Sequence, residues 1–109
     1  MKLEYEFRIR SAIDKVRAFV EDAEANVILE TVTNAYNLME DYLNKNMEGF
    51  ELYGKLVPFI NVSEERVDVD YEIWLGNKKI TDTSKYDEQL GKLLEVAYND
   101  LGWEAENED

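Results

Sequence analysis

Three carboxylates occupy every second position in the segment Val67–Leu75, which reads V-D-V-D-Y-E-I-W-L. Asp68, Asp70 and Glu72 alternate with apolar residues, so a strand here would place all three on one face. Carboxylates in such a row can coordinate a divalent cation, act as an acid–base pair, neutralise nearby cations or present charge to a basic partner. Which of these applies depends on what lies opposite the row.

Metal binding and carboxylate catalysis fit this spacing poorly. Side chains two positions apart on a strand lie about 6.6–7 Å apart and point the same way, so they do not converge on one ion. A glycosidase-like pair requires two acids in a cleft, and among 25 acidic residues some pair always has a suitable spacing. The absence of histidine and cysteine excludes Ser-His-Asp triads, Cys-His pairs and ordinary zinc sites. We therefore expect no catalytic residue, no metal site and no cofactor.

Two interpretations of the acidic row remain. If the first strand pairs with it, Arg8 and Arg10 lie opposite the acids, and the row is an ordinary solvated face with cross-strand ion pairs. Alternatively, the evenly spaced charges imitate a phosphate backbone, and Trp74, which shares their parity, is an interface anchor. The candidate partner-binding residues are Asp68, Asp70, Glu72, Trp74, Glu64 and Glu65.

Negative charge is concentrated beyond the N-terminal region. The net charge is −13, and the segment 21–44 contains acids but no lysine or arginine. Such a surface repels nucleic acid and anionic membranes and attracts basic proteins, so we expect a basic protein partner and no direct contact with nucleic acid or membrane. A second candidate binding face consists of Glu21, Asp22, Glu24, Glu30, Glu40 and Asp41.

The first half of the chain is expected to form one strand and two helices. Residues 2–10 alternate strictly between apolar and charged, which predicts a half-buried strand. Ser11 then begins a helix with a capping-box-like spacing. The apolar stripe changes face near residues 24–27, which predicts a break there, with Asn26 capping a second helix that Gly49 ends.

The second half is expected to form a small antiparallel sheet. The segments Phe50–Tyr53 and Lys55–Val62 predict two strands or one bent strand, and Pro58 favours either an edge position or an interruption of the strand there. A polar turn follows at Asn61–Arg66. The dipeptide at positions 76 and 77, Gly-Asn, predicts a tight hairpin that joins the acidic strand to a strand at 78–82.

A final helix is predicted from Ser84, a cap residue, to Gly102, a glycine that ends helices. Trp103 is expected to fold back onto this helix. The fold class is thus α+β in the order β-α-α-β-β-β-α, with an antiparallel sheet packed against helices. We expect one domain over residues 1–103 and a disordered acidic tail over 104–109. The core stripe of the final helix consists of Tyr86, Leu90, Leu93, Leu94, Ala97 and Leu101.

These features predict a non-enzymatic inhibitor that binds a basic protein, most concretely a DNA mimic that blocks a nuclease or another nucleic-acid-binding protein. With 109 residues, strong negative charge and no catalytic motif, the chain is similar in general character to phage anti-defence proteins, including anti-CRISPR and anti-restriction proteins, and to toxin immunity proteins. The alternative is a small scaffold or oligomerisation module, for example a homodimer. No apolar run approaches the about 20 residues of a membrane span, and no signal-peptide pattern is present, so we expect a cytoplasmic protein.

Overall fold

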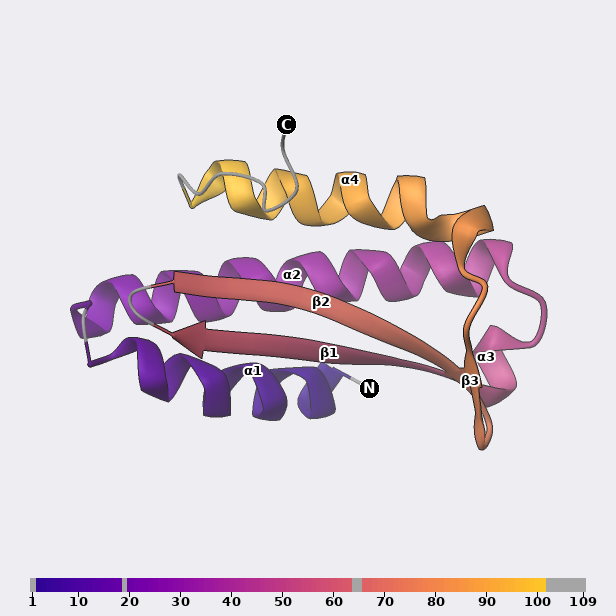
Figure 1. The fold of residues 1–109 in the computed structure, drawn as a ribbon, viewed down its shortest axis with the longest axis horizontal. Coiled ribbons are helices and arrows are strands. Elements are labelled where there is room, and N and C mark those ends of the chain that lie inside the picture. The colour runs from indigo at the N-terminus through magenta and orange to yellow at the C-terminus, as the bar shows by residue number, and fades with distance from the viewer. Residues whose placement is uncertain (1, 19, 64–65, 102–109) are drawn as a thin grey trace.

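In the computed structural model shown in Figure 1, the described residues form four helices and a three-stranded antiparallel sheet. The structure describes residues 2–18, 20–63 and 66–101, and for residues 2–7, 62–63 and 66–67 it describes the backbone alone. In chain order the elements are α1 (Lys2–Val16), α2 (Asp22–Asn46), α3 (Phe50–Tyr53), β1 (Gly54–Ser63), β2 (Arg66–Leu75), β3 (Lys78–Ile80) and α4 (Ser84–Asp100).

The long helix α2 lies behind the two long strands, with α1 on one side of it and α4 on the other (Figure 1). The molecule is a thin slab of about 41 × 33 × 19 Å, so the sheet has helix packed on one face only. The predicted α+β class and the antiparallel sheet are therefore confirmed. The predicted element order is wrong at its first element, which is a helix.

Residues 2–10 belong to α1 and are not a strand. The buried side chains of α1 recur at Ile9, Ala12, Ile13 and Val16, which is helical spacing, and this stripe crosses the expected boundary at Ser11 without interruption. The period-two pattern at the N-terminus is so short that it is compatible with a strand or with a helix. Continuity with the helical stripe that follows decided in favour of the helix.

The break between the first two helices lies at residues 17–21, upstream of the predicted position. Val16 is the last buried residue of α1, and Ala23, already in α2, is exposed. Arg17 bridges the turn, since its guanidinium contacts Asp22 at 3.0 Å and donates to the Asn26 side-chain oxygen at 3.3 Å. Asn26 therefore lies inside α2 and does not cap it.

The chain leaves α2 through a short second turn. Met47 is the C-cap of α2, whereas Gly49, with a left-handed φ of 83°, precedes the single-turn helix α3. The prediction that Gly49 ends α2 is therefore wrong, as is the predicted strand at Phe50–Tyr53. The fully buried Phe50 ring anchors α3 to the core and explains why this apolar segment is helical.

The sheet has the order β1-β2-β3. Hairpin pairing runs from Gly54 opposite Leu75 to Ser63 opposite Arg66, so the predicted turn is shorter than expected. Gly76, with φ 63°, forms the predicted tight turn to β3. As Pro58 indicated, β1 is an edge strand, although it is not interrupted there.

The core lies between α2 and the inner face of the sheet. Tyr36, Met39 and Leu43 of α2 meet Leu56 of β1 and Ile73 of β2, and all five are fully buried. The predicted stripe of α4 is confirmed, because every one of its six residues is buried or packed partly buried against this core. None of the helices in the described part of the chain is both long and apolar enough to cross a membrane.

The start of α4 lies one residue from the expected place. Thr83 is the N-cap residue, and its carbonyl oxygen accepts the backbone N–H of Tyr86 and of Asp87 at 2.9 and 3.0 Å. Ser84 instead donates through its backbone and hydroxyl to Asp82, which lowers the pKa of that carboxyl. Gly102, Trp103 and the expected tail at 104–109 lie outside the described residues.

Candidate functional site

The acidic row lies on the face of the sheet opposite α2. Val69, Tyr71, Ile73 and Leu75 pack against the core, so the alternating residues of β2 point away from it. We call this surface the open face. Residues that share it in the pairing register are Lys55, Val57, Phe59 and Asn61 of β1, Asp68, Asp70, Glu72 and Trp74 of β2, and Lys79 of β3.

No arginine of α1 lies across the strands from the acidic row. Because residues 2–16 form a helix, the expected cross-strand pairing of Arg8 and Arg10 with the row is wrong. The residues directly opposite the acids are Asn61, Phe59 and Val57, which carry no charge. In the register the row therefore lies opposite uncharged residues of β1.

Glu72 is neutralised from the other side, by β3. The Lys79 ammonium lies 2.7 Å from Glu72 Oε2, and the Trp74 indole N–H donates to Glu72 Oε1 at 3.0 Å. These contacts, the lysine first, lower the pKa of Glu72. Both oxygens of Glu72 are thus engaged, and its charge serves to fix Lys79 and Trp74 in place.

Asp70 has a different environment. Its carboxylate is exposed and accepts the backbone N–H of Tyr71 at 2.8 Å. Within the described part of the chain, no lysine or arginine forms an ion pair with it. The Phe59 ring, which lies directly opposite in the register, is 43% exposed. An exposed carboxylate and an exposed aromatic residue thus occupy directly opposite register positions on the open face.

Hydrogen bonds from tyrosine hydroxyls fix the position of the part of β2 that contains Asp70. Tyr36 of α2 donates to the Asp70 carbonyl, and the Tyr98 hydroxyl of α4 both accepts from and donates to the Val69 backbone at 3.2 Å. Tyr71 donates to the Asp87 carboxylate of α4 at 2.6 Å. Burial, followed by the nearby carboxylates, raises the pKa of Tyr36 and of Tyr71, so both stay neutral donors.

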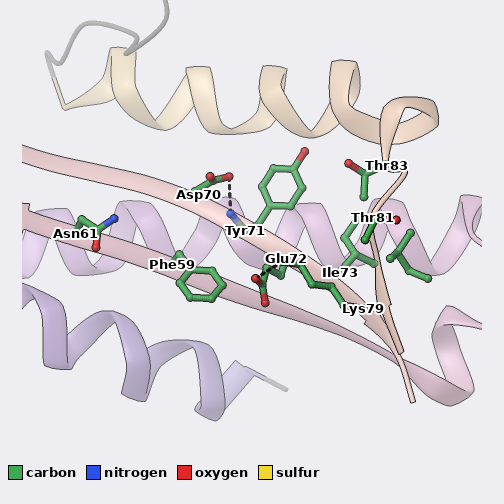
Figure 2. Close-up of a pocket in the computed structure, with 10 residues that line it drawn as sticks. Phe59, Asn61, Asp70, Tyr71, Glu72, Ile73, Lys79, Thr81 and Thr83 are labelled. Carbon is green, nitrogen blue, oxygen red and sulfur yellow. Dashed lines mark hydrogen bonds and ion pairs between the residues drawn. The ribbon is translucent and has the colours of Figure 1, made fainter. Parts of the chain in front are cut away.

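A hollow of about 470 Å³ lies on the open face beside Phe59 and Asp70. Figure 2 shows side chains of β1 and β2 around it, closed at one end by Lys79 and the segment that leads to α4. Its lining combines aromatic, amide and carboxylate groups. No cluster of three or more potential metal-ligating side chains occurs in the part of the chain that the structure describes.

The other predicted binding residues are not all on the open face. Asp68 is half-buried on the open face, and Glu64 and Glu65 lie outside the described residues. Glu21 and Glu24 are exposed at the start of α2, where Asp22 pairs with Arg17. The remaining three acids of the second candidate face divide between surface and interior. Glu30 and Asp41, three helical turns apart, are exposed, whereas Glu40 is buried.

Sequence reasoning missed Phe59, Asn61 and Lys79. The two-residue hairpin at Gly76 already requires Lys79 to lie opposite Trp74, so the sequence contained the signal for that pairing. The register that places Phe59 opposite Asp70 depends on the exact length of the other hairpin, for which the sequence offered no specific turn motif. Comparison with protein families, with curated proteins and with solved structures found no match for this chain.

Proposed function

We propose that this chain is a non-enzymatic protein that binds a basic protein surface through the open face of its sheet. The observation that carries the proposal is the exposed Asp70, which forms no ion pair with a described lysine or arginine and lies opposite the exposed Phe59 in the register. No helix of the described part of the chain covers this face of the sheet (Figure 1). In its most concrete form the protein is an inhibitor that imitates a phosphate backbone and blocks a nuclease or another nucleic-acid-binding protein. Phage anti-defence and toxin immunity are the biological settings that suit such an inhibitor.

The mechanism is electrostatic docking around an aromatic anchor. Asp68 and Asp70 project about 6.6–7 Å apart along β2 and take the place of phosphates against lysine and arginine of the partner. The overall charge of −13 accelerates encounter, and salt weakens it. Lys55 and Lys79 lie at the other end of the open face, so its acidic part is the end with Asp68 and Asp70. This uneven charge fixes the orientation in which a basic partner docks.

The test is capture of the partner from a host-cell lysate, followed by charge reversal. The variant Asp68→Lys/Asp70→Lys is compared with Glu88→Lys/Glu95→Lys, which makes the same change in net charge at exposed positions of α4. Circular dichroism checks that both variants fold, and the neutral pair Asp68→Asn/Asp70→Asn replaces the first if it does not. We expect salt-sensitive binding that only the β2 variant loses. Equal binding by both folded variants rejects the open face.

A small scaffold that associates through helix faces is the second candidate. Val27 and Leu38 of α2 and Val96 of α4 are 55%, 53% and 57% exposed, although they are apolar. Light scattering over a salt titration tests this function. A constitutive oligomer that persists at high salt and dissociates in Leu38→Glu favours the scaffold, whereas a monomer at all salt concentrations excludes it.

A further inference from the structure

The hollow on the open face has the groups that recognise a planar cation. Phe59, Asn61, Asp70 and Glu72 contribute to its wall, together with Lys79 from β3 (Figure 2). The charges of Lys79 and Glu72 already compensate each other, because these two side chains form an ion pair at 2.7 Å. The charge that is left for a ligand in this hollow is that of Asp70.

Phe59 determines which cation fits best. Phe59 and Asp70 are opposite each other in the register and both line the hollow, although Figure 2 shows the ring turned toward Glu72 and the carboxylate toward the Tyr71 amide. Because both side chains are exposed, a group that enters the hollow can meet the ring on one side and the carboxylate on the other. A guanidinium is flat, stacks on an aromatic face and donates two parallel hydrogen bonds to a carboxylate. An ammonium offers a point charge without this planar match.

We propose that the hollow is a receptor for an arginine side chain of the basic partner. In this receptor the guanidinium lies over the Phe59 ring and donates to the Asp70 carboxylate. This inference rests on the proposed function and deepens it, since it names the residue type that the partner must supply. The ion pair of Glu72 with Lys79 closes one end of the hollow, and Lys79 repels a second cation there.

The experiment uses the full chain, isotopically labelled, and two short probes. One probe is a peptide of alternating arginine and glycine, and the other is its lysine counterpart. Amide NMR shifts locate each probe and give its affinity. Asp70→Asn and Phe59→Leu test the two receptor groups, and Glu95→Gln, at an exposed position of α4, is the matched control for loss of one negative charge. Phe59→Leu keeps an apolar side chain at a partly exposed site and is expected to fold.

We expect the arginine peptide to shift the amides of Phe59, Asn61 and Asp70 and to bind roughly threefold to tenfold more tightly than the lysine peptide. Asp70→Asn and Phe59→Leu should each weaken it by about threefold or more, and Glu95→Gln by much less. Equal affinities for the two peptides, or equal losses in Asp70→Asn and Glu95→Gln, overturn the arginine receptor and leave the proposed function standing. If neither peptide shifts any amide of the open face, the proposed function fails with it.

Discussion

The two glycines at positions 54 and 91 allow the same substitution to be tested with opposite expected signs. Gly54 joins α3 to β1, and its N–H donates to the Phe50 carbonyl. A Cβ built at Gly54 would overlap the Phe50 ring and lie 2.6 Å from the Phe50 carbonyl oxygen. The ring is 2% exposed, so it cannot turn away without opening the core. Gly91 lies inside α4, and a Cβ there meets no atom within 4 Å.

Gly54→Ala should therefore lower the free energy of unfolding by about 2–3 kcal/mol, the cost of overpacking a core contact that the backbone must shift to relieve. Gly91→Ala should raise it by about 0.5–1 kcal/mol, because alanine is the better helix former and adds no clash. For a domain of this size the first change removes a large share of the total stability.

Urea unfolding followed by circular dichroism measures both variants against the unmodified chain. The midpoints should move in opposite directions with the slope unchanged, which shows that the folded states bury similar surface. The packing of Phe50 against the start of β1 would be refuted if Gly54→Ala unfolded at the same urea concentration as the unmodified chain. Because β1 begins there, that result would also question the register that sets Phe59 opposite Asp70.

Three further predictions concern the groups around β2. Tyr98→Phe removes the partner of the Val69 backbone and should cost about 1 kcal/mol, with faster amide hydrogen exchange at Val69; unchanged exchange would contradict the contact. Lys79→Met should raise the pKa of Glu72 in a carboxyl NMR titration. The stability that Glu72 contributes should be complete above the ordinary pKa of glutamate and lost as the pH falls through the lowered folded-state pKa. Burial raises the pKa of Tyr36, so its contribution should be complete below about pH 10 and lost as the pH rises further, which tyrosinate absorbance during alkaline unfolding would detect.

Prediction from the sequence succeeded where a local pattern had one interpretation. The alternation over Val67–Leu75, the tight turn at Gly76 and the apolar stripe of α4 each appear in the structure close to where they were expected. In each case the spacing of the residues and the turn residue next to the segment predict the same structure. Asp68, Asp70, Glu72 and Trp74 were placed on one face of a strand for the same reason, and the register confirms that placement.

Prediction failed where two patterns met or where the partner of a residue lay far away in the sequence. Residues 2–10 alternate like a strand, yet they continue the buried stripe of Ile9, Ile13 and Val16. Gly49 has the left-handed conformation that ends many helices, but here it precedes another one. The failure at the N-terminus had a consequence for the site, because Arg8 and Arg10 lie on a helix and not on a strand paired with the acidic row.

The sequence alone determined the period of β2 and of α4, the excess of negative charge and the absence of thiol and imidazole groups, because these properties belong to single residues and short spacings. The tertiary structure alone decided what lies beside each carboxylate. Glu72 is paired because a hairpin returns Lys79 to it, and Asp70 is left with an aromatic neighbour because β1 pairs in a particular register. Neighbours of this kind depend on how separate segments pack, and one shift of register would replace them all.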